Sequence, residues 1–454
     1  MAKYQKYAEY KDSGVEWLGE IPSHWEMWKL AHAYSEIGSG TTPSTTNEEN
    51  FEGDIPWVTT GELRENTIFD TKKKVSKKTL ELYPTLKKYP VGSVAIAMYG
   101  ATIGRLGIFG VEATTNQACC VMTISKVLNN DYLFYWLQAF KDEIVQLSSG
   151  GGQPNINQEK VASLRISAPN VKDQTQIANF LDHETAKIDH LIEKQQQLIE
   201  LLKEKRQAVI SHAVTKGLNP NVPMKDSGVE WLGKVPEHWE VTRFAYQIFY
   251  QEGPGILAVD FHETGIPLLR IQNVKSDFVS NDYKTYLSPS KVLSKWDHYR
   301  VEKGDLIISC SASTGLVSEV DESTVGAIPY TGLIRLKPRT RKIISQYIKL
   351  LVQSDLFFEQ IEVLQTGSTI QHFGPFHLQQ MYISLPPNEE QEVICLEVKN
   401  RVRDIENLIL KAESAIQLIQ ERRTALISAA VTGKIDVRHW QAPTVAEAQT
   451  ELSA

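Results

Sequence analysis

The residues that could take part in catalysis do not complete a familiar catalytic motif. The His-Glu pair at 183–184 begins a zinc-protease pattern, but Lys187 stands where the second histidine ligand would have to be. The Gly-Lys pair at 433–434 lacks the upstream glycine loop that a phosphate-binding P-loop requires. The Pro-Pro pair at 386–387 is not followed by the aromatic residue of an amino-methyltransferase loop. The sequence therefore favours a binding protein, and an enzyme with an unfamiliar active site remains a rival interpretation.

Three polar loops flanked by glycines carry side chains suited to hydrogen bonding with a ligand. They are TTGEL after Trp57, YGATIGR after Met98 and SSGGGQPNIN after Leu147. Glycine lets a backbone approach a ligand closely, and hydroxyl, amide and guanidinium groups offer both donors and acceptors. Each loop alone could be an ordinary turn, but the three together favour a binding rim.

The densest basic stretch of the chain runs from residue 72 to residue 88. It holds seven lysines and a single acid, Glu81. Such a stretch can contact phosphate groups, or it can be an ordinary solvated face. The net charge of −7 does not argue against phosphate binding, because the acidic excess lies outside the two globular blocks.

The composition predicts a soluble cytoplasmic protein of two to four domains. The 454 residues contain no run of 18 or more apolar residues, so we expect no membrane span. The N-terminal segment lacks the apolar core of a secretory signal. The four cysteines show no C-x-x-C spacing and are expected to be reduced, buried thiols.

A long internal duplication organises the chain. Residues 11–26 read KDSGVEWLGEIPSHWE and residues 225–240 read KDSGVEWLGKVPEHWE, identical at 13 of 16 positions with an offset of 214 (225 − 11). Farther along, LRISAPNVKDQTQI at 164–177 aligns with MYISLPPNEEQEVI at 381–394, with an offset of 217 (381 − 164). A period near 215 residues is the size of a domain plus a connector, so two similar binding surfaces are expected.

Each copy contains a helical pattern after its globular block. Apolar residues fall at heptad a and d positions, with a further row at Ile192/Ile199 and Ile409/Ile416. The predicted a and d residues are Ile188, Leu191, Leu198, Leu202, Val209, and Ile405, Leu408, Ala412, Ala415, Ile419, Leu426. The matching registers favour an antiparallel coiled coil, and the alternative is two helices that each pack only on their own domain.

The repeated signature SGVEWLGEIPSHWE, the YGATIGR element and ISAPNVKDQTQIANFLD resemble the specificity subunits of type I restriction–modification enzymes. The resemblance covers roughly residues 11–436. It implies an α+β protein with two similar mixed α/β target-recognition domains. Two long antiparallel helices would join them as a coiled coil, giving an internal pseudo-two-fold repeat. The second copy departs from the pattern, since residues 312–315 (ASTG) replace GATIG.

The resemblance implies five segments. They are a first target-recognition domain at 1–170, a first spacer helix at 171–218, a second recognition domain at 219–386, a second spacer helix at 387–436, and a remaining tail at 437–454, which is expected to be disordered because it has little core-forming content.

The function implied is that of a non-catalytic DNA specificity subunit. Each domain would read one half of a bipartite, asymmetric duplex DNA target, and the helices would set the spacer between the halves. Two modification (methyltransferase) subunits would dock on the chain, and two motor-nuclease restriction subunits would join them. No cofactor is expected on this chain, whereas S-adenosylmethionine is expected on the methyltransferase.

Base contacts require polar side chains on loops, and phosphate contacts require lysine or arginine. The DNA-binding residues expected in the first domain are Thr59, Thr60, Lys72, Lys73, Lys74, Lys77, Lys78, Tyr99, Thr102, Arg105, Gln153, Asn155 and Asn157. Those expected in the second domain are Arg270, Gln272, Asn273, Ser311, Ser313, Thr314, Thr366, Ser368, Thr369, Gln371 and His372. Further phosphate contacts are expected from Lys291, Lys295, Arg339, Arg341 and Lys342.

Four repeated tryptophans, Trp17, Trp25, Trp231 and Trp239, lie in acidic segments, so stacking on bases is not expected. They could pin each repeat onto the helix ends, or they could form part of the partner-binding surface. A purely structural coiled-coil scaffold is a third interpretation of the whole chain, but it leaves the polar glycine loops without a role.

Overall fold

The computed structural model describes residues 4–147, 155–310, 316–364 and 373–442. The chain forms two compact units. Unit 1 comprises Met1–Gln195 together with Ser414–Ala454, and unit 2 comprises Gln196–Glu413. The two long helices begin close to the predicted boundaries, but each helix contributes one part to each unit.

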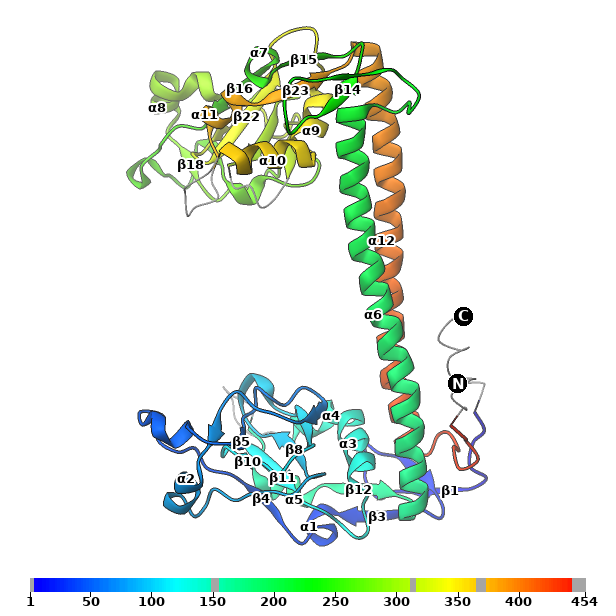
Figure 1. The fold of residues 1–454 in the computed structure, drawn as a ribbon. Coiled ribbons are helices and arrows are strands. Elements are labelled where there is room, and N and C mark those ends of the chain that lie inside the picture. The colour runs from blue at the N-terminus through cyan, green and yellow to red at the C-terminus, as the bar shows by residue number, and fades with distance from the viewer. Residues whose placement is uncertain (1–3, 148–154, 311–315, 365–372, 443–454) are drawn as a thin grey trace. The chain divides into compact units, whose positions relative to one another are not determined.

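Unit 1 contains a mixed α/β domain (Figure 1). Its strands are β1 (Tyr10–Asp12), β2 (Glu20–Pro22), β3 (Glu26–Lys29), β4 (Ile37–Ser39), β5 (Ile55–Val58), β6 (Asn66–Ile68), β7 (Lys74–Val75), β8 (Val94–Ala97), β9 (Leu106–Phe109), β10 (Thr114–Thr115), β11 (Cys119–Met122) and β12 (Arg165–Ala168). Its helices are α1 (Leu30–Ala33), α2 (Lys77–Leu82), α3 (Asn130–Ala139), α4 (Lys141–Gln146), α5 (Gln158–Ser163) and the first part of α6 (Val171–Lys216).

Unit 2 contains a second mixed domain of similar order. Its strands are β13 (Met224–Asp226), β14 (Lys234–Pro236), β15 (Glu240–Arg243), β16 (Ile248–Glu252), β17 (Ile266–Leu269), β18 (Tyr286–Leu287), β19 (Leu306–Ser309), β20 (Val317–Glu319), β21 (Ile328–Pro329), β22 (Leu333–Pro338) and β23 (Tyr382–Leu385). Its helices are α7 (Phe244–Gln247), α8 (Pro289–Lys291), α9 (Ser345–Gln353), α10 (Asp355–Leu364), α11 (Pro375–Gln380) and the first part of α12 (Asn388–Val431).

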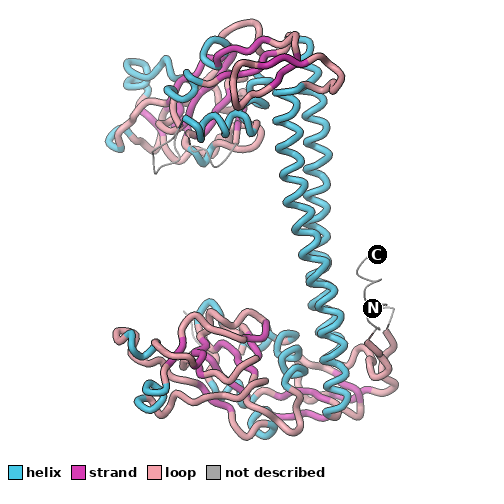
Figure 2. The backbone as a smooth tube through the Cα atoms, viewed as in Figure 1, coloured by secondary structure: helices cyan, strands magenta, loops and turns pink. Residues whose placement is uncertain are grey.

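The sheets of the two units share one plan. In unit 1, the order β4-β11-β8-β9-β6 forms the main sheet and β10-β5-β7 forms a smaller one. In unit 2, β16-β22-β19-β20 and β18-β17-β21 occupy the corresponding places. In both units helices and loops surround the strands (Figure 2). The predicted α+β class with two similar mixed domains and two long helices is confirmed.

The repeated sixteen residues form the same hairpin twice. β1 pairs antiparallel with β2, and β13 pairs with β14 in the same register, 214 residues later. In the first copy the amide of Ser13 donates to the carbonyl of Gly19 over 3.0 Å, and the counterpart bond in the second copy is also 3.0 Å. The Asp12 carboxylate accepts the Gly14 amide at 2.9 Å, again as in the second copy. Much of the sequence identity therefore preserves a turn.

The seam between the long helices differs from the predicted one. Leu191 and Leu198 are 51% and 43% exposed, so they do not lie in the seam. Ile188, Ile199 and Leu202 are buried. The residues that are buried or half-buried in matching rows of both helices are Leu181, Thr185, Ile188, Ile192, Gln195, Ile199, Leu202, Arg206, Ile210 and Ala213, and their counterparts 217 residues later. From Leu181 to Arg206 the spacing alternates between four and three residues, which is the heptad pattern of a coiled-coil seam.

One ion pair beside the seam links the two long helices in each unit. In unit 1, Arg423 lies 2.9 Å from Asp189. In unit 2, Arg206 lies 3.3 Å from Glu406. These pairs are equivalent under the 217-residue offset, since 189 + 217 gives 406 and 206 + 217 gives 423. Each unit therefore contains the same ion pair, built from opposite copies.

A buried tyrosine ties each domain to the end of the helix from the other copy. In unit 1, the Tyr132 hydroxyl bonds the carbonyls of Ser167 at 2.6 Å and Val431 at 3.1 Å. In unit 2, the hydroxyl of Tyr347 bonds the counterpart carbonyls at 3.2 and 3.4 Å. Burial raises the pKa of both phenols well above the ordinary value. The helix of one repeat thus completes the domain of the other.

A fully buried glutamine fastens the start of each long helix. The Gln174 amide bonds Asn129 N at 2.7 Å, Val127 O at 2.9 Å and Pro169 O at 2.8 Å. Gln391 makes the same three bonds at its counterpart backbone positions in unit 2.

We expect Gln174→Leu to lower the free energy of unfolding by about 3 kcal/mol, because it leaves buried backbone groups without hydrogen-bond partners. Gln391→Leu should have an effect of similar size, and Gln420→Ala on an exposed helix face should have almost none. Urea denaturation would measure all three. Equal midpoints for the wild type and both leucine variants would contradict the proposed structural role.

The first residues of the segment predicted to be a disordered tail contact unit 1. Trp440 packs edge-on against Phe180 at 5.5 Å, and its carbonyl accepts a hydrogen bond from Gln176. Arg438 lies over the Tyr7 ring at 4.9 Å and pairs with Asp436 at 2.6 Å. Residues 437–442 are therefore packed on unit 1, and residues 443–454 lie outside the described part of the chain.

Candidate nucleic-acid and partner interfaces

The same turn occurs in both domains, but the side chains at its first two positions differ. In unit 1, the Glu62 carboxylate accepts the Thr59 amide at 2.8 Å. In unit 2, the Asn273 amide oxygen accepts the Arg270 amide at 2.9 Å. Both turns follow the strand that pairs parallel with a short neighbour, β5 with β10 and β17 with β21. The backbone of the turn is therefore the same in both domains, whereas its first two residues are Thr59-Thr60 in unit 1 and Arg270-Ile271 in unit 2.

Asn273 is a structural residue, so its predicted role in DNA contact is wrong. Its side chain is 1% exposed, and its amide nitrogen donates to the carbonyls of Ser280 and Asp282 at 3.0 Å each. Its amide oxygen holds the turn, and its amide nitrogen holds the loop that follows. Gln272 next to it is exposed and available.

Arg270 is held against aromatic rings. Its guanidinium carbon lies 4.8 Å from the centre of Phe261 and 5.0 Å from that of Tyr330. The described residues provide no carboxylate for it, and its Nε is buried without a partner. Stacking restrains a guanidinium while leaving its outer N–H groups free, which suits bidentate hydrogen bonding.

Two of the polar loops of unit 1 meet, as a common rim requires. Tyr99 and Asn155 form an antiparallel backbone bridge, and both are exposed. The Thr102 hydroxyl donates to the Tyr99 carbonyl at 3.3 Å. Arg105 is half-buried, and no side-chain partner for it is found among the described residues.

Asn157 at the end of this region has a local role. Its side chain accepts the Lys160 amide at 2.9 Å and so caps the start of α5. This cap is a sufficient reason for an asparagine at this position. Gln153 lies outside the described residues.

The basic stretch of unit 1 divides into paired and unpaired lysines. Lys74 lies 2.8 Å from Asp70, and this contact lowers the pKa of the Asp70 carboxyl. Lys73 stacks on Phe51 at 4.7 Å, and Lys78 has a distant acidic neighbour at 3.9 Å. In the described structure, Lys72 and Lys77 are exposed and without an ionic partner, so of the predicted phosphate contacts they are the most available.

Several cations predicted in unit 2 are already engaged. Lys291 pairs with Asp260, Lys342 pairs with Glu240 at 2.9 Å, and Arg339 donates to a backbone carbonyl at 2.9 Å. The remaining two are Lys295 and Arg341. The other predicted DNA contacts of this unit lie outside the described residues: Ser311, Ser313, Thr314, Thr366, Ser368, Thr369, Gln371 and His372.

The repeated tryptophans pin the hairpins to the rest of each unit. Trp25 and Trp239 are 0% and 1% exposed, so their predicted place on a partner-binding surface is wrong. Trp25 packs beside Gly433, and Trp239 packs beside Gly217 just after the last turn of α6. Trp17 and Trp231 are half-buried and belong to apolar clusters of their own units.

A helix face that the sequence analysis missed recurs in both units. On α6 of unit 2, Leu201, Lys205, Ala208 and His212 are exposed at a spacing of four, three and four residues. On α12 of unit 1, the counterparts Leu418 and Arg422 are exposed and Ala425 is half-buried, whereas the fourth counterpart, Ala429, is buried. Leu201 and Leu418 are 61% and 65% exposed. The sequence did contain a signal: a leucine, a basic residue and an alanine occur at the same positions of both long helices, 217 residues apart and outside the seam.

Other kinds of site find no support in the part of the chain that the structure describes. No group of three or more His, Cys, Asp or Glu side chains there could hold a metal ion. None of the described helices is long and apolar enough to cross a membrane. The four cysteines are free thiols; Cys119, Cys120 and Cys310 are buried as predicted, whereas Cys395 is half-buried. Burial raises the pKa of Cys120 and of Cys310 to about 12.

Comparison with known proteins identifies the family. The model of the type I restriction modification DNA specificity domain matches residues 22–201 and 266–412. The chain belongs to this family. The two matches fall on the two repeats, so the specificity domain occurs twice, as the duplication predicts.

Specificity subunits similar to this chain extend over most of its length. That of the type I restriction enzyme MjaVIII from Methanocaldococcus jannaschii is 24% identical over 426 residues, which covers 92% of this chain and 95% of that protein. That of EcoKI from Escherichia coli is 21% identical and covers 73% of this chain and 71% of that protein.

Solved structures share the fold of the specificity family. The HsdS subunit from Thermoanaerobacter tengcongensis has a TM-score of 0.55 at 13% identity, covering 91% of this chain and 98% of that chain. A chain from a study of complex assembly and conformational transition of the type I R-M system has a TM-score of 0.71 at 14% identity, covering 91% and 99%.

Proposed function

We propose that this chain is the DNA specificity subunit of a type I restriction–modification complex, acting in the cytoplasm without catalytic activity of its own. Each domain reads one half of a bipartite, asymmetric duplex target. The two long helices set the spacer between the halves. Two methyltransferase subunits dock on the chain and bind S-adenosylmethionine, and motor-nuclease subunits join when restriction follows.

The observation that carries this proposal is that the same backbone turn occurs in both domains with different side chains at its first two positions. Two identical half-sites would favour identical side chains in the two turns, whereas Thr59-Thr60 and Arg270-Ile271 suit different bases. An arginine stacked as Arg270 is fits the bidentate contact that guanidinium groups make with guanine.

The recurrence of one helix face supports docking of two copies of a single partner. Leu201 and Lys205 in unit 2 have the same types as Leu418 and Arg422 in unit 1. Exposed leucines beside basic groups fit an amphipathic, acidic segment of a partner protein. Two equivalent faces fit two copies of it.

The deciding experiment is single-molecule methylation sequencing of plasmid DNA from cells that express this chain and its neighbouring methyltransferase, together and separately. N6-methyladenine in a split motif only under co-expression is the expected result. Methylation by this chain alone would replace the proposal with an unrecognised enzyme. No methylation together with no binding to duplex DNA would favour a structural scaffold.

We expect the double variant Lys72→Ala, Lys77→Ala to weaken DNA binding by the assembled complex to a similar degree on every sequence. The slope of log affinity against log salt should fall by about two, one for each lost phosphate contact. The matched control is Lys87→Ala, Lys88→Ala, because these lysines pair with Glu36 and Glu112 at 3.0 and 3.1 Å. A larger change in slope for the control would contradict the assignment.

A further inference from the structure

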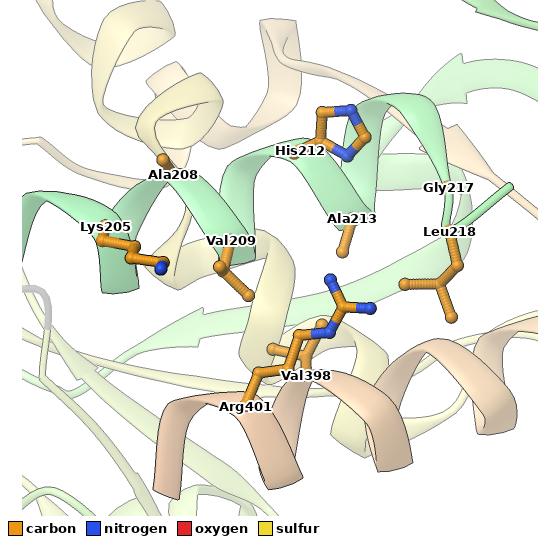
Figure 3. Close-up of a pocket in the computed structure, with 9 residues that line it drawn as sticks. All are labelled: Lys205, Ala208, Val209, His212, Ala213, Gly217, Leu218, Val398 and Arg401. Carbon is orange, nitrogen blue, oxygen red and sulfur yellow. The ribbon is translucent and has the colours of Figure 1, made fainter. Parts of the chain in front are cut away.

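A cavity of about 230 Å³ lies in unit 2 between the last turns of α6, the residues that follow it and the first part of α12 (Figure 3). Its apolar lining consists of Ala208, Val209, Ala213, Gly217, Leu218 and Val398. Val209 and Ala213 face Val398 and Arg401 across the gap between the helices. The volume fits one large side chain rather than a cofactor.

Three basic side chains surround this apolar pocket. They are Lys205, His212 and Arg401. Arg401 donates to Glu397 at 2.7 Å, whereas Lys205 and His212 are exposed and show no side-chain partner among the described residues. The pocket therefore favours an apolar or aromatic group flanked by carboxylates.

In unit 1 the equivalent place is filled by the chain itself. The 217-residue offset maps Lys205 onto Arg422 and Arg401 onto Glu184. Tyr4 lies there: its hydroxyl donates to Glu184 at 3.4 Å and its ring packs edge-on against Phe180 at 5.4 Å. Burial and the Glu184 carboxylate raise the pKa of Tyr4, and the Arg422 charge opposes this rise.

The difference shows in the exposure of equivalent residues. Ala429 of unit 1 is 1% exposed and belongs to the core cluster against which Tyr4 packs. Its counterpart His212 in unit 2 is exposed and lines the open pocket. In unit 2 the chain runs directly from Gly217 into Leu218, which closes one end of the pocket without filling it.

We propose that the pocket of unit 2 is the socket for an aromatic side chain, flanked by acidic residues, of the methyltransferase subunit. This inference rests on the proposed function. The pocket continues the recurring helix face, because Lys205, Ala208 and His212 belong to both. Tyr4 occupies the equivalent socket of unit 1, so the two partner copies dock unequally, and the first docks on unit 2.

The test is a titration of the full chain with its methyltransferase subunit, followed by native mass spectrometry. The wild type is expected to pass through a populated 1:1 complex. Ala208→Trp, which fills the socket from an exposed position, should weaken the first step by about tenfold or more. Lys205→Glu should also weaken it, and more so at low salt, since it reverses a charge at the rim.

The matched control is Ala425→Trp at the equivalent position of unit 1, which should leave the first step unchanged. Tyr4→Ala vacates the other socket and should tighten the second step. Equal affinities in both steps for the wild type, or an unaltered first step for Ala208→Trp, would overturn the inference.

Two further outcomes separate this inference from the function on which it rests. A homodimer of this chain that Ala208→Trp abolishes would show that a second copy occupies the socket, which overturns the inference alone. Failure of the wild type to bind the methyltransferase at all would overturn the proposed function, and the inference with it.

Discussion

Replacement of residues 27–170 by the equivalent block of another specificity subunit is expected to change one half of the methylated motif completely and to leave the other half intact. The block carries the first polar loops and the Lys72 stretch. It also carries most of β3 together with its partner β12, so this strand pair moves as a unit. The methylated motif, read by single-molecule sequencing, measures the result.

The reciprocal exchange of residues 241–386 is the matched control, since it moves β15 with β23 in the same way. It should change only the half that the first exchange preserves. A change in both halves after either exchange would contradict independent reading by the two domains. Loss of all methylation with a folded protein would instead point to failed contact with the helix end at Val431.

Addition of one heptad to each long helix is expected to lengthen the spacer of the target by about three base pairs. Seven residues add about 10 Å at 1.5 Å per residue, and duplex DNA rises 3.4 Å per base pair. A whole heptad in both helices keeps the a and d rows in register, whereas an insertion into one helix alone would offset the antiparallel pair.

The insertions would follow Leu198 and Ala415, which are equivalent positions outside the seam. A matched insertion into α6 alone should lower the melting temperature, because Arg206 and Glu406 would lose their register. The motif of the double insertion would again be read by sequencing. An unaltered spacer at full activity would eliminate the helices as its determinant.

The sequence was sufficient to predict the duplication, the two mixed domains and the long helices, but not the face on which the helices meet. Both Leu191 and Ile192 are apolar, as are Leu198 and Ile199, so two heptad registers were compatible with the pattern. The facing helix decides between them. In the structure Ile199 is buried, while Leu191 and Leu198 are exposed, so the isoleucine row packs on the facing helix.

The prediction of DNA-contacting residues failed where a polar side chain forms hydrogen bonds with the protein's own backbone. Asn273 has the chemistry of a base reader, but the carbonyls that consume its amide are seven and nine residues away in a loop with no recognisable pattern. Lysines 87 and 88 appear free in the sequence because their acidic partners lie 51 and 24 residues distant. Arg270, in contrast, has no acidic partner among the described residues.

The exchange of helix ends between the repeats has a consequence for synthesis on the ribosome. Unit 2 is a continuous stretch, Gln196–Glu413, and can close as soon as it has emerged. Unit 1 begins first but needs Val431, which supplies a carbonyl to Tyr132, so it must wait for almost the whole chain. Until then the apolar faces around Trp25 and Tyr132 stay uncovered, and a prematurely terminated product presents them to chaperones and proteases.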